Sequence, residues 1–164
     1  MHSLTKKEIL RSFVNSSQSR IKTVAFPPSF DETEWEELDF YGWVDPRSPQ
    51  RAYLVTTHAS GATGIELRRA NSEGARPRSA MCNLCHAVHR HGGTALFTAR
   101  KAGASGKAGN SIGTYLCTDF CCSLYARGLK LLPDNQPEHA LPTQTRIAQL
   151  CHRLDGFVAR VLTT

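Results

Sequence analysis

The sequence predicts an α+β fold for its 164 residues, because the strand-like segments come in pairs that read as β-hairpins, with helix-like segments flanking them. The clearest helix spans residues 143–162, where apolar residues recur at spacings of three and four. Strand-like runs rich in β-branched and aromatic residues lie at 51–59, 65–70, 94–99 and 111–116. The length is typical of one domain, or of one domain with a small appendage.

The cysteines are the most specific chemical signal in the chain. Cys82 and Cys85 form a Cys-x-x-Cys pair, and Cys117 is followed by the adjacent residues Cys121 and Cys122. Tetrahedral zinc takes four soft ligands at about 2.3 Å, and two tight turns that each carry two thiols supply them. We therefore expect one structural zinc ion. A gap of three or four residues after Cys117 reaches the same metal, so spacing leaves both Cys121 and Cys122 open as the fourth ligand.

The segments around these cysteines follow the treble-clef order of knuckle, β-hairpin and helix. A Gly-Gly turn follows the first pair, strands at 94–99 and 111–116 form the hairpin, and a helix follows Cys117. We expect Thr118 to cap this helix and Asp119 to complement its dipole. The helix should run over residues 120–127 and end at Gly128.

Two other interpretations of the first pair are weaker. Cys82 to His86 also matches Cys-x-x-Cys-His, the haem attachment signature, but that chemistry needs export and leaves Cys117 and Cys122 without a role. A redox pair of thioredoxin type needs a strand-to-helix setting, whereas a hairpin follows here. Three nearby histidines are expected to be solvated or to support the ligands from outside, namely His86, His89 and His91.

The amino-terminal half carries less specific signals. Thr5 and Glu8 predict a capping box for a helix within residues 3–15, and residues 21–26 alternate like a strand. Seven of the fourteen acids lie between positions 31 and 45, where we expect a short helix or turn that inserts Trp35 and Leu38 into the core. We divide the chain into an amino-terminal α/β portion, a zinc module, and a connector with a final helix, at 1–80, 81–130 and 131–164.

Charge is segregated along the chain, whose net charge is +6. Residues 47–130 carry twelve Lys and Arg against three acids, an excess of nine, which favours an acidic partner such as ribosomal RNA or an acidic protein surface. The hairpin tip at 99–111 carries Arg100, Lys101 and Lys107 on a Gly/Ala/Ser backbone that we expect to be too flexible to pack. It is either a mobile loop or a cationic finger that orders on a partner.

Three residues flank the proposed metal site and are candidates either for partner contact or for packing: Tyr115, Tyr125 and Arg127. The run GNSIGTYLCTDFCCSLYARG at 109–128 closely resembles the carboxyl-terminal treble-clef zinc finger of elongation factor G-binding proteins, a family that includes fusidic-acid resistance proteins. A weaker likeness extends over residues 41–55 and the last helix. The resemblance implies Cys122 as the fourth ligand and elongation factor G as the partner. It also implies a role in releasing that factor from the ribosome, with fusidic acid tolerance as one outcome.

An enzyme is the function class that the sequence favours least. It contains no phosphate-binding loop, no His-Glu-x-x-His, no deaminase signature and no serine elbow. A four-thiolate zinc site leaves no coordination position for water, although a three-ligand catalytic zinc would return if neither Cys121 nor Cys122 bound the metal. Without a signal peptide or a long apolar run, we expect a cytoplasmic binding protein without membrane or small-molecule substrate. The alternative is a zinc protein that binds the ribosome or RNA.

Overall fold

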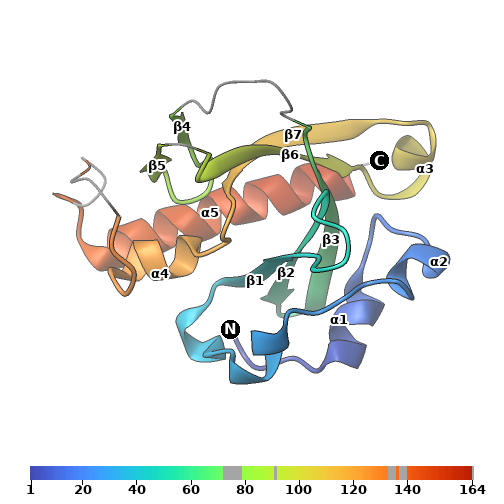
Figure 1. Ribbon diagram of the computed structural model, residues 1–164, viewed down its shortest axis with the longest axis horizontal. Helices are drawn as coiled ribbons and strands as arrows, with labels where there is room; N and C mark the ends of the chain where they lie inside the picture. The colour runs from blue at the N-terminus through green and yellow to red at the C-terminus, as the bar shows by residue number, and fades with distance from the viewer. Residues whose placement is uncertain (72–78, 91, 133–135, 137–139, 164) are drawn as a thin grey trace.

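The computed structural model describes residues 1–71, 79–90, 92–132, 136 and 140–163 (Figure 1). Its centre is a five-stranded antiparallel sheet in the order β1-β2-β3-β6-β7. A second, two-stranded sheet pairs β4 with β5. The strands are β1 (Phe40–Val44), β2 (Arg51–His58), β3 (Gly61–Arg69), β4 (Ala80–Met81), β5 (Val88–His89), β6 (Thr94–Arg100) and β7 (Ser111–Cys117).

Helices cover both faces of the large sheet. The longest, α5 (Thr143–Leu162), lies along the face opposite the amino-terminal segments (Figure 1). Because neighbouring side chains of a strand point to opposite faces, Ala52 and Leu54 pack in the core on the α5 side, while Tyr53 and Val55 pack in the amino-terminal core. The other helices are α1 (Lys6–Ser12), α2 (Gln18–Ile21), α3 (Gly103–Lys107) and α4 (Cys122–Arg127), with 3-10 turns η1 (Pro28–Glu32) and η2 (Trp35–Glu37).

The amino-terminal core is an aromatic cluster around one buried carboxylate. The rings of Trp43 and Tyr53 lie 4.9 Å apart, and those of Tyr41 and Trp43 lie 5.1 Å apart. Asp45 is 1% exposed and accepts hydrogen bonds from the Tyr53 hydroxyl at 2.9 Å and the Ala25 amide at 3.2 Å. Burial and the Asp45 carboxylate raise the pKa of Tyr53. These bonds satisfy an acid that would otherwise be costly to bury.

One amino-terminal expectation is wrong, and a second is confirmed except at its end. Residues 21–26 do not form a strand, because Ser17 caps the short helix α2 and the following backbone joins no ladder among the described residues. Ala25 instead binds side chains, donating to Asp45 and accepting from the Trp43 indole at 2.9 Å. The acidic stretch does contain short turns, and Trp35 and Leu38 do pack on the aromatic core, but its end forms strand β1.

The hairpin tip also differs from expectation. Residues 103–107 form the short helix α3, whose Gly106 is buried against the chain. A Cβ atom at Gly106 would lie 1.8 Å from the Lys101 carbonyl oxygen, so only glycine fits this close approach. The Ala102 amide donates to the carbonyl of Val161 in α5 at 2.8 Å. The tip is therefore packed against the final helix, contrary to the flexible loop that its composition predicts.

Several local predictions are confirmed. Helix α5 spans the predicted residues, and the β2–β3 and β6–β7 hairpins form where the strand-like runs lie. Thr5 and Glu8 form the capping box of α1, with the Glu8 amide 3.2 Å from the Thr5 hydroxyl. Most of the predicted loop at 71–79 and part of the connector at 131–142 lie outside the described residues. None of the helices in the described chain combines the length and the apolar character needed to cross a membrane.

Candidate metal centre

Four buried thiols converge where the small sheet meets the end of the β6–β7 hairpin. The β4–β5 turn supplies Cys82 and Cys85, the end of β7 supplies Cys117, and the first turn of α4 supplies Cys122. All four sulfur atoms lie within 4.8 Å of one another. The Sγ atoms are 3.6 Å apart for Cys82 and Cys122 and 3.5 Å apart for Cys85 and Cys117. A zinc tetrahedron with bonds of about 2.3 Å has edges of about 3.8 Å, so the cluster fits one ion.

The backbone of both turns is shaped to hold these sulfurs. In the first turn the Leu84 amide points at the Cys82 sulfur at 3.4 Å, and His86, just after Cys85, adopts a positive φ of 59°. In the second turn Phe120 adopts a φ of 55°, which is uncommon for a bulky residue. Its ring occupies the space beside Gly42 in β1, where a Cβ atom would lie 2.5 Å from the Phe120 ring. The Phe120 contact therefore ties the metal turn to the sheet.

The electrostatics of the cluster call for a cation. Hydrogen bonds from Cys117, Cys122 and Cys85 hold the pKa of the Cys82 thiol well below its usual value. For Cys122, hydrogen bonds with the other three cysteines of the cluster and burial raise the pKa of the thiol well above its usual value. Four thiolates require a compensating charge, which a bound Zn²⁺ supplies.

Cys121 lies outside this cluster. It occupies the N-cap position of α4, where its sulfur is 3.4 Å from the Asp119 carbonyl oxygen and 3.4 Å from the Lys130 amino group. The four thiols that converge are thus those that the family resemblance implies, with Cys122 as the fourth. The sequence predicts that Thr118 caps α4, but Cys121 occupies the N-cap position. The Thr118 hydroxyl instead donates to the carbonyl oxygens of Gly92 and Gly93.

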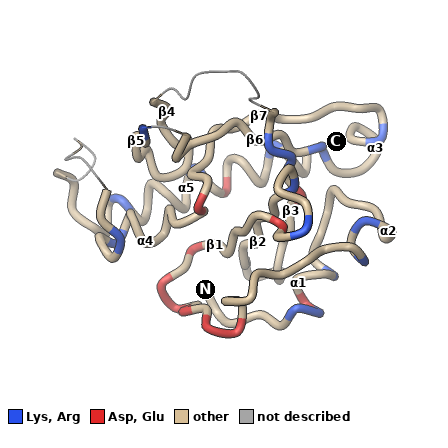
Figure 2. Tube along the Cα trace, viewed as in Figure 1, with Lys and Arg blue, Asp and Glu red and all other residues tan. Residues whose placement is uncertain are grey.

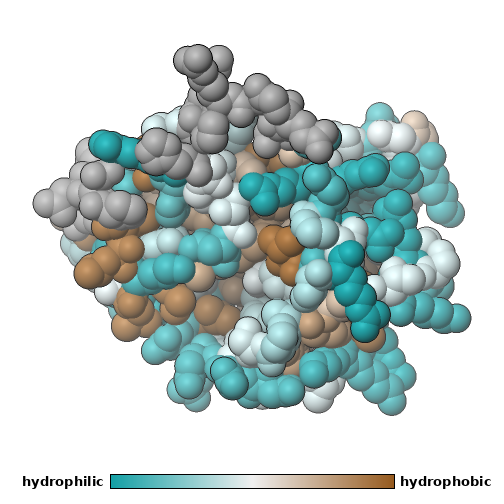
Figure 3. Space-filling model, viewed as in Figure 1, coloured by the Kyte–Doolittle hydropathy of each residue, from teal (hydrophilic) through white to brown (hydrophobic). Residues whose placement is uncertain are grey.

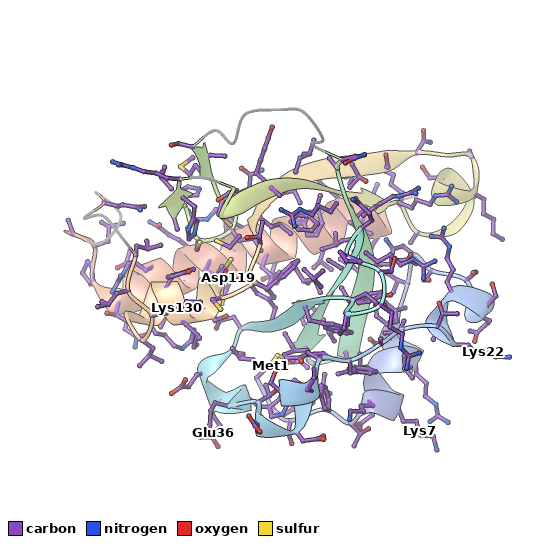
Figure 4. All side chains as sticks on the ribbon, in the orientation of Figure 1. Met1, Lys7, Lys22, Glu36, Asp119 and Lys130 are labelled. Atoms are coloured by element: carbon purple, nitrogen blue, oxygen red, sulfur yellow. The ribbon has the colours of Figure 1, made fainter. Side chains whose placement is uncertain are left out.

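Asp119 lies at the N-terminus of α4, as expected, where its carboxylate accepts from the Cys121 amide at 3.0 Å, and it also binds two neighbouring side chains. Asp119 accepts from the Tyr125 hydroxyl at 2.7 Å and from the Lys130 amino group at 2.9 Å; Asp119 and Lys130 are labelled in Figure 4. Burial opposes its ionisation, but these bonds and the Cys121 amide more than offset that effect and lower the pKa of Asp119. The α4 helix ends as predicted at Gly128, which has a φ of 72°.

These features agree with comparison to protein families. The model of the FBP C-terminal treble-clef zinc-finger family matches residues 8–161. The chain belongs to this family. No curated protein and no solved structure shows significant similarity to it. The fold is therefore α+β with a treble-clef zinc finger, and its four close, buried cysteines are compatible with one structural zinc site.

Among the histidines near the knuckle that the structure describes, His89 supports the cluster directly. His89 is buried, its ring lies 5.3 Å from that of Tyr125, and its Nε2 atom is 3.3 Å from the Cys117 sulfur. His86 lies 3.3 Å from the Arg153 guanidinium of α5. His91 is outside the described residues. His89 thus has the supporting position that we expect for this group, beside a ligand.

The candidate partner-binding residues divide into two groups. Arg100 and Lys107 are exposed, Lys101 is half-buried, and Tyr115 is 44% exposed on β7. Tyr125, by contrast, is 6% exposed, with its hydroxyl bound to Asp119. The first group is accessible to a partner, whereas Tyr125 packs within the zinc module.

Arg127 also has an internal role. Its guanidinium forms a two-pronged ion pair with Asp39, at 2.6 and 2.9 Å, and this contact raises the pKa of Arg127. The Asp39 amide donates to the Ser123 hydroxyl at 3.0 Å. Asp39, which directly precedes β1, therefore contacts both Ser123 and Arg127 of α4. Spacing along the sequence carries no sign of this pair, because its members are 88 positions apart.

Proposed function

We propose that this zinc protein binds elongation factor G and promotes its release from the ribosome, with fusidic acid tolerance as a possible consequence. The observation that carries the proposal is the family match over residues 8–161, whose most specific part is the Gly-Thr-Tyr to Arg-Gly run around the second cysteine pair. The family name itself points to a protein partner. A zinc ion closed by four thiolates has no open position for water, which supports a binding role rather than catalysis.

The surface near the zinc module suits contact with a protein. Met81 and Val88, which pair across the small sheet, are 48% and 40% exposed, and Tyr115 lies on the strand that follows the tip. The Asn83 amide donates to the Tyr115 carbonyl at 2.8 Å, so Tyr115 and the knuckle share one rigid unit. Hydrophobic residues also gather over α4 and the segment after it (Figure 3). Aromatic and apolar side chains on a rigid base are typical anchors of a protein interface.

Lys101 and Lys107 then have a different role from these anchors. They carry positive charge at the packed α3 tip, where they can steer an acidic partner without being buried by it. Truncating a central anchor raises the dissociation rate, whereas removing a rim charge chiefly lowers the association rate. This difference separates the two groups experimentally.

The test is calorimetric titration of the zinc-loaded chain into elongation factor G from the same organism. We expect saturable one-to-one binding that persists at about 0.15 M salt, where surface charges are screened beyond about 8 Å. Tyr115→Ala should weaken binding by about tenfold or more, as for an interface anchor. In stopped-flow mixing, which measures rates, Lys101→Gln with Lys107→Gln should lower the association rate and its salt dependence. The control Lys7→Gln lies on α1, where the side chain points away from the molecule (Figure 4).

A release assay completes the test. We expect the chain to speed dissociation of elongation factor G from ribosomes stalled with fusidic acid, and Tyr115→Ala to lose that effect. The absence of any complex at low salt would overturn the proposal while leaving the zinc fold intact. Binding to ribosomal RNA is the second candidate, and a group of arginines at the opposite end of the large sheet favours it.

A further inference from the structure

A cleft of about 360 Å³ opens at the end of the large sheet that lies away from the cysteines. Figure 1 shows α2 and α3 at this end of the molecule. The cleft has four arginines and one acid in its lining, together with polar side chains. The charged residues are Arg20, Arg51, Arg68, Arg100 and Glu66, and the hydroxyl of Ser111 lies beside them.

Strand register brings these residues together. Arg51 of β2 is the direct partner of Arg68 of β3, and Arg68 in turn faces Thr98 of β6. Arg100 lies two residues beyond Thr98, on the same face, and is paired with Ser111 of β7. The result is one polar row across four strands.

Asn15 fixes the segment that carries Arg20 onto this row. Its amide nitrogen donates to the carbonyl oxygens of Glu66 at 3.0 Å and Arg100 at 2.9 Å, and its oxygen accepts from the Glu66 amide at 2.8 Å. Arg20 of α2 therefore closes the cleft from the amino-terminal side. The Asn15 side chain makes three hydrogen bonds to strand backbone, and these bonds hold the segment that precedes Arg20 on the sheet.

The charges in the cleft do not balance. Glu66 has a side chain only 10% exposed, forms an ion pair with Arg20 at 2.9 Å and accepts a hydrogen bond from Ser16. Arg51 donates to the neutral Thr23 hydroxyl at 3.1 Å. Among the described residues, no carboxylate lies within ion-pair distance of Arg51, Arg68 or Arg100. Three guanidinium groups thus line one concave surface without a counter-ion from the described part of the chain.

We propose that this arginine cleft binds a phosphate group, carried by an RNA backbone or by a free nucleotide. A guanidinium donates two parallel hydrogen bonds to a phosphate, and three of them offset more than one negative charge. A cleft of this volume is in the range of small-ligand sites and accommodates a phosphate with an attached sugar. A metal cation is disfavoured because Glu66, the acid in the lining, is already neutralised by Arg20.

The cleft lies at the opposite end of the hairpin from the apolar anchors proposed for elongation factor G, although the steering residues Lys101 and Lys107 lie at the cleft's own end. Cys117 pairs with Thr94 at one end of the β6–β7 ladder, whereas Ser111 pairs with Arg100 at the other. The Tyr115 anchor and the apolar residues belong to the cysteine end. A result on the cleft therefore stands whether or not the chain binds that protein.

The experiment measures fluorescence anisotropy of a labelled ten-nucleotide RNA with the full, zinc-loaded chain. We expect the double variant Arg68→Gln with Arg100→Gln to weaken RNA binding by about tenfold or more, because each substitution removes a charged hydrogen-bond donor to phosphate. The slope of log affinity against log salt should fall by about 1.4, because each arginine that neutralises a single-strand phosphate contributes about 0.7. Arg68→Lys with Arg100→Lys, which keeps the charge and removes the planar fork, should fall between the wild type and the Gln variant.

The matched control is Lys7→Gln with Arg11→Gln, which removes two exposed charges from α1, outside the cleft. Zinc content and thermal unfolding confirm that each variant is folded. Competition by adenosine monophosphate and by inorganic phosphate separates the two sources of the ligand. If either competitor displaces the RNA at millimolar concentration, the cleft takes a small phosphate ligand such as a nucleotide. If neither competitor displaces the RNA, the cleft binds the RNA backbone.

Three results would overturn the proposal. The first is equal weakening of RNA binding in the cleft variant and in the α1 control, because that would report net charge alone. The second is no binding of RNA, nucleotide or phosphate at about 50 mM salt, where phosphate contacts are strongest. The third is displacement of the RNA by a polyglutamate peptide from the wild type and the cleft variant alike.

Discussion

The two ends of the β6–β7 hairpin carry opposite kinds of site. At one end four thiols lie buried within 4.8 Å of one another. At the other, Arg68 and Arg100 are exposed at the cleft, and Figure 2 shows lysines and arginines near the ends of β3 and β6. The four buried thiols cannot all ionise without a metal, so binding of the metal ion contributes to the stability of the folded state. The arginines are solvated, so the protein folds without their counter-ion and remains able to bind one.

This difference predicts a ranking of effects on stability. Groups that need a partner inside the fold should be costly to change, and groups that face water should be nearly neutral. Three substitutions test that ranking, from the cysteine cluster to the ion pair of α4 and then to the arginine cleft.

The largest effect is expected at the fourth thiol. Cys122→Ser should lose the zinc ion and unfold the zinc module, because structural zinc contributes on the order of 10 kcal/mol of apparent binding free energy to folding. Cys121→Ser should keep one zinc per chain, because its sulfur faces Lys130 and not the cluster. Metal analysis of protein prepared without chelator, with thermal unfolding by circular dichroism, measures both. The reverse pattern would reassign the ligand.

An intermediate effect is expected for the link between the amino-terminal segment and α4. Asp39→Asn should lower the free energy of unfolding by about 2 kcal/mol, because it weakens a two-pronged ion pair whose side chains are 10% and 19% exposed. Glu36→Gln is the matched control, since this exposed carboxylate lies on the same acidic stretch and points outward (Figure 4). Urea unfolding at neutral pH compares the two. Equal losses would mean that the ion pair adds nothing beyond net charge.

The smallest effect is expected at the arginine cleft. Arg68→Gln with Arg100→Gln should change the free energy of unfolding by about 0.5 kcal/mol or less, or raise it, because Arg68 faces the like charge of Arg51 across the β2–β3 pair. The same urea experiment measures this. A loss as large as that of Asp39→Asn would mean that the arginines hold the sheet together, and the contrast between the two ends of the hairpin would fail.

Much of the zinc module followed from local patterns in the sequence. The first cysteine pair and Cys117 lie where their spacing predicts, and Gly128 ends α4 as expected. Spacing alone left Cys121 and Cys122 equivalent, because both are within reach of the same ion. The structure separates them by the turn at Phe120, whose backbone directs one sulfur into the cluster and the other toward Lys130.

Expectations failed where packing overrode composition. The Gly/Ala/Ser tip has the composition of a flexible loop, yet Gly106 permits a tight turn that docks on α5 through Ala102. Residues 21–26 alternate like a strand, but the buried Asp45 and the Trp43 indole take their backbone groups instead. In both cases a contact with a residue at least 18 positions away decided the local structure.

The sequence by itself determined the helix of α5, the capping box of α1, the two hairpins and the first pair of thiols. Each of these depends on side chains within a few residues of one another, where periodicity and spacing act directly. Only the tertiary structure decided the ion pair of Asp39 with Arg127 and the convergence of the cleft arginines. Arg20 and Glu66 lie 46 positions apart, and Asp39 and Arg127 lie 88 positions apart; the register of the strands and the docking of helices bring them together.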